Sequence, residues 1–243
     1  MICNKYKLTN RIGNGSFGEI YKGINVRTGE EVAIKVESID SPYKILKKEA
    51  QIYQYLEMQD GFPHLKWFGT DNINNYMVIN LLGESIYSYI EKNGKIDAKD
   101  AIAYGRQMID RICFFHSKKM IHRDIKPHNF LFGLKNTDMI YLIDFGLSKS
   151  YLDNENKHIP YLDGQKIIGS FNFVSENIKN GIVPSRRDDV VSIIKVIIYM
   201  IDDINYKEML TNLSKEISNI GFEESPNYEE TKKSVKSSKS KKV

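Results

Sequence analysis

The sequence predicts an α+β fold, with a strand-rich first part and a mostly helical second part. Five short segments of strand-like composition and a single helical segment fill residues 5–81. From residue 85 onward, longer stretches of helical composition take over. With 243 residues, of which 41% are hydrophobic, the chain is long enough to bury a sizeable core in one large or two small domains.

The first part contains a glycine-rich turn between two of its strands. The expected strands are residues 5–12, 19–23, 32–36, 65–70 and 76–81. Gly13, Gly15 and Gly18 form a Gly-x-Gly-x-x-Gly pattern, which lets a hairpin close over a nucleotide and point its amides at phosphates. The same pattern fits a Rossmann turn or a plain hairpin. Because strands flank it on both sides and no helix follows, the nucleotide-binding hairpin is favoured.

One lysine stands out in the third strand. Lys35 lies among apolar neighbours, where it either holds phosphates or is a surface lysine whose stem covers apolar area. A helix is expected from about Pro42 to Met58, with proline in its first turn. Its apolar residues share one face, and most of its charges are expected to face solvent.

The segment Asn80-Leu81-Leu82-Gly83 is typical of a hinge. Backbone groups from Asn80 to Leu82 are candidates for binding the edge of an adenine. Four apolar residues are expected above and below the ring: Ile12, Ile20, Ala33 and Leu131. Each of the four also fits an ordinary core position. After the hinge, residues 85–120 are expected to be helical, with a break at Asn93-Gly94 and a cap at Asp97.

Residues 121–133 contain the largest group of candidate catalytic and metal-binding residues in the chain. Asp124 lies five residues before Asn129, with Lys126 between them, and Asp144 follows the apolar run 140–143. Such a set offers one carboxylate to an attacking hydroxyl, and an amide and a second carboxylate to magnesium. Lys126 adds positive charge where a phosphoryl group becomes anionic. Asp, Asn, Pro and Gly also gather in turns for local reasons, but so many identities in order favour a site.

Residues 147–243 contain some patterns that indicate function and others that indicate only structure. A loop from Leu147 to about Gly169 is long enough to be functional. Arg186-Arg187-Asp188-Asp189 opens an apolar helix over 190–201, where two acids also suit a simple cap. Residues 206–220 are expected to form one more amphipathic helix. Residues 223–243 are polar and rich in serine and lysine, so they are expected to be a disordered tail.

The charge distribution and the cysteine content limit the classes of partner and the cellular compartment that we expect. Residues 232–243 hold six lysines and no acid, so without them the formal charge falls from +4 to −2. The remaining chain gives no reason to expect a nucleic acid or a membrane as a partner. Cys3 and Cys113 lie far apart without metal-ligand spacing, which indicates reduced thiols in the cytoplasm or nucleus. The chain begins without an apolar signal core, and the apolar run 190–201 is too short to span a bilayer.

Taken together, these segments resemble the protein kinase family, and within it the casein kinase 1 branch. The resemblance covers about residues 5–201. It rests on Gly-Asn-Gly-Ser-Phe-Gly-Glu-Ile-Tyr at 13–21, Val-Ala-Ile-Lys-Val-Glu at 32–37, Leu-Leu-Gly at 81–83, His-Arg-Asp-Ile-Lys-Pro-His-Asn-Phe-Leu at 122–131, His-Ile-Pro-Tyr at 158–161 and Ser-Arg-Arg-Asp-Asp at 185–189. The last two are unusual among kinases in general and are typical of this branch.

The resemblance implies a two-lobed kinase domain over residues 1–222. The small lobe, 1–80, would hold a five-stranded antiparallel sheet with one helix, and the hinge, 80–83, would lead to a mostly helical lobe over 84–222. The large lobe would be truncated after its buried central helix. The resemblance also implies ATP and Mg²⁺ as cofactors, serine or threonine of proteins as acceptors, and a monomer.

Residue roles carried over from the family are expectations of the same kind. Asp124 would be the catalytic base, Lys126 would stabilise the transferred group, and Asn129 and Asp144 would hold metal. Lys35 would hold phosphates and pair with Glu49 from the first helix. Asp189 would brace the catalytic loop, and His122 would serve as scaffold.

The chain departs from the branch at three points. Ser175-Glu176-Asn177 keeps two residues of the family's Ser-Ile-Asn. Asn172 stands where the family has an arginine that helps to bind a phosphate already on the substrate, so little preference for phospho-primed substrates is expected. The likeness ends soon after residue 201. A pseudokinase that binds nucleotide or a partner is therefore the alternative to an enzyme, and a small-molecule kinase is a third hypothesis.

Overall fold

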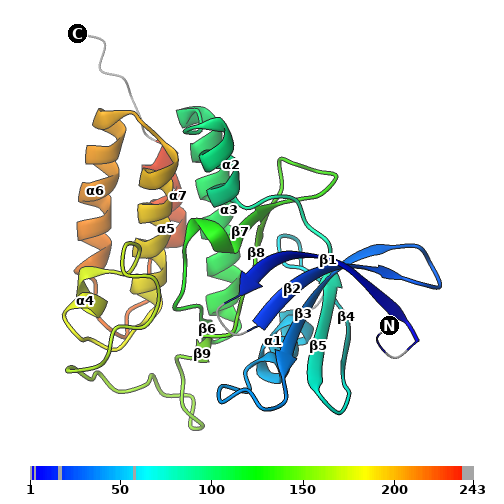
Figure 1. Cartoon of the computed structure of the whole chain (residues 1–243). Coiled ribbons are helices and arrows are strands. Elements are labelled where there is room, and N and C mark those ends of the chain that lie inside the picture. The colour runs from blue at the N-terminus through cyan, green and yellow to red at the C-terminus, as the bar shows by residue number, and fades with distance from the viewer. Residues whose placement is uncertain (1, 3, 16–17, 57–58, 237–243) are drawn as a thin grey trace.

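The structure is a computed structural model that describes residues 2, 4–15, 18–56 and 59–236. Four parts of the predictions lie outside these residues: Cys3, the tip of the glycine-rich turn at 16–17, the end of the first helix at 57–58 and the tail end at 237–243. A sheet with one helix lies beside a larger group of helices, and the chain crosses between them once near β5 and α2 (Figure 1). The predicted α+β, two-lobed architecture is confirmed.

The small lobe is a five-stranded antiparallel sheet in the order β1-β2-β3-β5-β4. Its strands are β1 (Tyr6–Gly15), β2 (Gly18–Asn25), β3 (Glu31–Ser38), β4 (Leu65–Thr70) and β5 (Asn74–Asn80). The helix α1 (Leu46–Leu56) packs against it, with Leu46, Ala50 and Tyr53 buried. Period-2 burial along β3 leaves Val32 and Ile34 fully buried.

The large lobe begins with two capped helices. Ser85 caps α2 (Ile86–Asn93), and Asp97 caps α3 (Ala98–Ser117) by accepting from the Lys99 backbone N–H at 2.9 Å. Two short strand pairs and a 3₁₀ turn then carry the catalytic-type segments: β6 (Met120–Ile121), η1 (Pro127–Asn129), β7 (Phe130–Phe132), β8 (Ile140–Leu142) and β9 (Lys149–Ser150), with β6 paired to β9 and β7 to β8. The predicted cap at Asp97 is confirmed.

The centre of the large lobe is α5 (Arg186–Met200), which follows the short α4 (Glu176–Lys179). Helix α5 is buried on nearly every side, and α3 and α6 pack against it. Ser185 and Asp188 form a capping box at its start, with the Ser185 backbone N–H donating to Asp188 Oδ2 at 2.8 Å. The interpretation as a helix cap is thus right for Asp188, whereas the Asp189 side chain is not part of the capping box.

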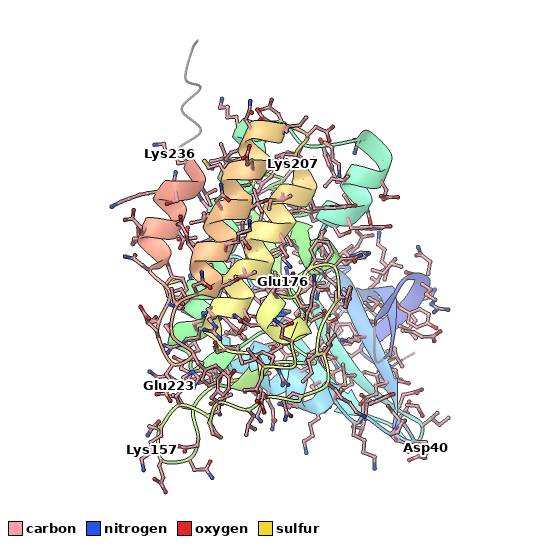
Figure 2. All side chains as sticks on the ribbon, turned by 90° about the vertical axis from the view of Figure 1, so that its left-hand side faces the viewer. Asp40, Lys157, Glu176, Lys207, Glu223 and Lys236 are labelled. Carbon is pink, nitrogen blue, oxygen red and sulfur yellow. The ribbon has the colours of Figure 1, made fainter. Side chains whose placement is uncertain are left out.

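Two further helices complete the lobe. Helix α6 (Ile204–Ser218) confirms the expected amphipathic helix and packs on α5. Helix α7 (Tyr228–Lys236) returns along α3, so that Lys207 near the start of α6 and Lys236 at the end of α7 lie at the same end of the lobe (Figure 2). Tyr206 of α6 donates to the Val235 carbonyl oxygen at 2.5 Å.

The prediction that residues 223–243 are disordered is wrong for residues 228–236. Helix α7 places only a few side chains in the core, but Val235 is fully buried and Thr231 is 4% exposed. Apart from Tyr228, its remaining residues are polar and exposed or half-buried, which is why the composition indicated a tail. Among the described residues, no helix has both the length and the apolar character needed to cross a membrane.

Candidate active site

A catalytic-type loop runs from β6 to β7, and one buried carboxylate holds its backbone. Asp189 of α5 accepts from the backbone N–H groups of His122 at 2.7 Å and Arg123 at 2.9 Å. Arg123 has φ +70°, a left-handed conformation that costs a non-glycine residue about 1–2 kcal/mol. The two hydrogen bonds hold that strained turn, so Asp189 braces the loop as the family resemblance implies.

Asp189 is itself held by a chain of neutral donors from two other helices. His116 of α3 lies with Nε2 2.9 Å from Asp189 Oδ2 and Nδ1 2.7 Å from the Tyr228 hydroxyl of α7. Since a carboxylate only accepts, Nε2 carries the proton and Nδ1 accepts from Tyr228. Burial lowers the pKa of His116, which keeps the ring neutral. We call Asp189, His116, Tyr228 and the two loop amides the loop-brace cluster.

The Asp124 carboxylate lies at the centre of the loop and is 5% exposed as a residue. Lys126 Nζ lies 2.7 Å from its Oδ2, and the Ser170 hydroxyl donates to its Oδ1 at 2.8 Å. Asn129 donates its side-chain N–H to the Asp124 backbone oxygen at 2.8 Å, which fixes the amide through its nitrogen. The three residues that the sequence groups together are therefore in direct contact.

His122 is part of this scaffold. Its Nε2 donates to the Ile143 carbonyl oxygen at 3.0 Å, and its Nδ1 accepts from the Asp124 backbone N–H at 3.3 Å. Both ring nitrogens are thus engaged within the protein, and the ring packs edge-on against Phe145. The contacts are those of a structural histidine.

A second cluster of charges connects the small lobe to Asp144. Lys35 Nζ lies 2.7 Å from Glu49 Oε2 and 3.1 Å from Asp144 Oδ1, and all three side chains are largely buried. We call these three residues the phosphate-side cluster. Burial alone would lower the pKa of Lys35, but the two carboxylates outweigh it and raise that pKa above its usual value. Burial raises the pKa of Glu49 to about 6, although Lys35 partly opposes this.

Asp144 also has a left-handed backbone, with φ +65°. Its N–H donates to the Tyr53 hydroxyl at 3.2 Å, and Phe145 packs below it against Tyr53, Phe62 and Phe115. Burial would raise the pKa of Asp144, but Lys35 outweighs it and the pKa is lowered, so the carboxylate stays ionised. The preceding residue, Ile143, donates its N–H to the Asn129 carbonyl oxygen at 3.0 Å, which brings Asp144 close to Asn129.

The glycine-rich hairpin lies over the phosphate-side cluster. A Cβ on Gly15 would lie 3.4 Å from Lys35 Cε, and a Cβ on Gly18 would clash at 2.3 Å with the Val36 carbonyl oxygen. Glycine at position 18 therefore allows β2 to approach β3 closely, and Gly15 places bare backbone next to Lys35. Gly13 pairs with Ile20 across the hairpin.

The residues predicted to surround the adenine lie on β1, β2, β3, β5 and β7 and in the hinge after β5. Ile20, Ala33, Asn80, Leu82 and Leu131 are half-buried, while Ile12 is 48% exposed. Leu131 forms a bridge to Ser85 just after the hinge, and the Gly83 N–H donates to the Phe132 carbonyl oxygen at 2.9 Å. The Asn80 side chain accepts from the His64 N–H at 2.7 Å, so it is used to hold β4 and leaves only its backbone for a ligand.

A model of the protein kinase domain matches residues 6–241. The chain belongs to the protein kinase family. The match continues past residue 201, where the sequence likeness to the casein kinase 1 branch fades, and it includes α6 and α7. Helices α6 and α7 thus lie within the residues that match the kinase domain.

Three polar residues that support the loop were not identified from the sequence. Ser170, His116 and Tyr228 all belong to polar networks at or behind the loop. Ser170 follows Gly169, which has a φ of +97°. A Cβ added at position 169 would clash with the Arg123 carbonyl oxygen, so this glycine indicates a close approach of its segment to the loop. Tyr228 gave no signal, because it opens a stretch of polar composition.

Proposed function

We propose that this kinase domain transfers the terminal phosphoryl group of ATP to serine or threonine hydroxyls of proteins, in the manner of casein kinase 1. The observation that carries the proposal is the convergence of Asp124, Lys126, Asn129 and Asp144 from two adjacent turns, with Lys35 bonded to Asp144 from the opposite lobe. Phosphoryl transfer depends mainly on such positioning and on charge stabilisation.

In the proposed reaction, the acceptor oxygen forms a bond to the terminal phosphorus while the bond to the bridging oxygen of ADP breaks. Asp124 orients the hydroxyl and takes its proton. Lys126, 2.7 Å from Asp124, stabilises the charge on the transferred group. Lys35 holds the nucleotide phosphates, and Glu49 holds Lys35 in place.

Mg²⁺ suits the donor set that would receive it. Asn129 presents an amide oxygen and Asp144 an ionised carboxylate, both hard donors, and magnesium is commonly held through one or two carboxylates together with substrate phosphates. When bound, the ion neutralises charge on the phosphates. Gly13, Gly15 and Gly18 would cover the phosphates, and Ile12, Ile20, Ala33, Leu82 and Leu131 would enclose the adenine near the Asn80 backbone.

Several finer points belong to the same proposal. We infer that the partners are protein substrates, that the chain acts as a monomer without specific nucleic-acid binding, and that it works in the cytoplasm or nucleus. The lobe boundaries near residues 80–83 are supported by the change from β5 to α2. The casein kinase 1 assignment is supported by His-Ile-Pro-Tyr at 158–161 and Ser-Arg-Arg-Asp-Asp at 185–189.

Transfer of labelled phosphate from ATP to a generic acidic protein tests the proposal. We expect wild type to label serine or threonine, as phosphoamino-acid analysis would reveal, and Asp124→Asn to label neither. Nucleotide binding without any transfer by wild type would favour the pseudokinase alternative. Labelling of tyrosine alone would reject the acceptor class.

A further inference from the structure

A cavity of about 430 Å³ lies beside the proposed catalytic centre. Its lining includes Tyr87 of α2, His128 of the catalytic-type loop, Phe173 of the segment before α4, and Ile198 and Tyr199 of α5. Its volume falls within the range of sites that enclose ligands in proteins. The residues that line it come from four separate elements, so the folded large lobe builds the cavity.

Two of the segments that line the cavity also contain residues that are hydrogen-bonded to Asp124. His128 lies in η1, immediately before Asn129, whose amide is bonded to the Asp124 backbone. On the other side, Ser170 donates to Asp124 and its carbonyl oxygen accepts from the Phe173 N–H at 2.8 Å. A polypeptide that presents a hydroxyl to Asp124 would therefore have neighbouring side chains within reach of this cavity.

The lining is mainly apolar and aromatic. Tyr87 and His128 are stacked, with ring centroids 3.8 Å apart, and Phe173 and Tyr199 meet edge-to-face at 5.9 Å. Such walls favour an apolar or aromatic occupant through area burial and ring packing.

Charged occupants are disfavoured by the polar groups at the rim. Lys195 also lines the cavity, but its ammonium is bonded to the Val174 carbonyl oxygen at 2.6 Å and to Glu176 at 3.3 Å. An acidic side chain would have to compete for that lysine and would meet the charge of Glu176. A basic side chain would meet Lys195 and the nearby Lys126.

We propose that this cavity binds one large apolar or aromatic side chain of the substrate polypeptide, a few residues from the accepting hydroxyl, and thereby selects substrates. The inference rests on the proposed kinase function and adds a substrate class to it. Selection by a phosphate on the substrate is not expected here. Asn172, which also lines the cavity, is exposed and carries no charge that could pair with a phosphate.

A matched peptide series tests the proposal. Each peptide carries one serine among small neutral residues, and phenylalanine is placed in turn at each of the three positions before and after it. At the best position, phenylalanine is then replaced by alanine, aspartate, lysine or phosphoserine. We expect phenylalanine to exceed alanine at least about tenfold in kcat/KM at one position, and to exceed the three charged residues as well.

Two substitutions in the cavity and one outside it locate the effect. Tyr87→Ala removes a wall, and Asn172→Trp fills the mouth from an exposed position, so the second variant keeps the test valid if the first disturbs folding. Both should reduce the phenylalanine-to-alanine ratio to near one. The control Tyr55→Ala changes a tyrosine on α1 that is 55% exposed and should keep the wild-type ratio.

Binding of peptides with alanine in place of the acceptor serine separates this inference from the proposed function. The anisotropy of a fluorescent label reports that binding without any reaction. Tighter binding of the phenylalanine peptide without phosphate transfer would retain the cavity proposal and reject the kinase function. Transfer without any preference for phenylalanine, equal binding of both peptides, or a preference that survives Tyr87→Ala and Asn172→Trp would overturn the cavity proposal.

Discussion

Two buried polar clusters meet at the candidate active site, and they are built differently. The phosphate-side cluster places one cation, Lys35, between the carboxylates of Glu49 and Asp144. The loop-brace cluster surrounds one carboxylate, Asp189, with neutral donors: two backbone amides and the His116 ring. In the first cluster full charges balance one another, whereas in the second hydrogen-bond dipoles stabilise a single charge.

The difference follows from what each cluster has to hold. The Asp189 carboxylate fixes the backbone of the loop. Burial would raise its pKa, but the hydrogen bonds from His116 and from the His122 backbone N–H help to lower it. Lys35 and Asp144 are proposed to engage phosphate and metal, a role that suits the full charges that both side chains keep. We therefore expect the loop-brace cluster to govern stability and the phosphate-side cluster to govern activity.

The largest effect is expected from Asp189→Ala. The substitution leaves two backbone N–H groups and the His116 Nε2–H buried without an acceptor, and it releases the strained turn at Arg123. We expect the free energy of unfolding to fall by about 3–5 kcal/mol. Urea unfolding checks this, and a loss below about 1 kcal/mol would contradict the role of Asp189 as a brace.

Lys35→Met tests the other cluster. We expect turnover to fall on the order of a hundredfold or more, while the free energy of unfolding changes by only about 1 kcal/mol. The fold tolerates the change because Glu49, whose pKa is already about 6, can take up a proton instead of remaining an unpaired buried charge. Kinase assays and urea unfolding on one preparation measure both quantities. A stability loss as large as that of Asp189→Ala would remove the proposed distinction.

The pKa of Glu49 predicts an acid limb in the activity profile. Below pH 6 this residue gains a proton and Lys35 loses one of its two charged partners, so kcat/KM should fall with a midpoint near pH 6. Glu49→Gln should remove that midpoint and leave a low activity across the range.

The stability contribution of Glu49 should change in the opposite direction. Its pKa in the folded state, about 6, exceeds the ordinary value of 4.5, so the folded protein binds the proton more tightly than the unfolded chain. This contribution is complete below pH 4.5 and is lost as the pH rises through 6. The difference in Tm between wild type and Glu49→Gln over this range reports it, and a difference that grows in favour of wild type with rising pH would contradict the assignment.

The smallest effect is expected from Tyr228→Phe. It removes the hydroxyl that donates to His116 Nδ1 and should lower the free energy of unfolding by about 1 kcal/mol and kcat by a few-fold. Tyr206→Phe is a matched control, since it removes a hydroxyl bonded to the Val235 carbonyl oxygen of α7 without touching His116. The control should lose similar stability and keep kcat. Equal kcat values for the two variants would exclude a link from α7 to the loop.

The sequence could predict the site wherever the chemistry requires particular residue types at a fixed spacing. Asp124, Lys126, Asn129 and Asp144 lie in such a pattern, and the strands and the buried helix α5 follow from apolar runs that local turns delimit. The expected Lys35–Glu49 pair is also present. That pairing came from family resemblance, because helix periodicity alone did not select one charge among many.

Long-range contacts could not be predicted in the same way. Helix α7 is anchored by very few residues, among them Tyr228 and Val235, in a stretch dominated by serine and charge, so composition indicated disorder. The engagement of Asn80 by His64 and of Asp124 by Ser170 depends on how separate segments meet. No local pattern records such tertiary hydrogen bonds.

Parallel measurement of turnover and nucleotide affinity in Asp124→Asn and Asp144→Asn tests the central claim most directly. Asp124 is proposed to act on the acceptor, so its substitution should reduce turnover by about a thousandfold or more and leave the Mg²⁺-dependent Kd for ATP within about twofold of wild type. Asp144 is proposed to hold metal, so its substitution should weaken Mg²⁺-dependent ATP binding as well. Wild-type turnover in Asp124→Asn would contradict the account.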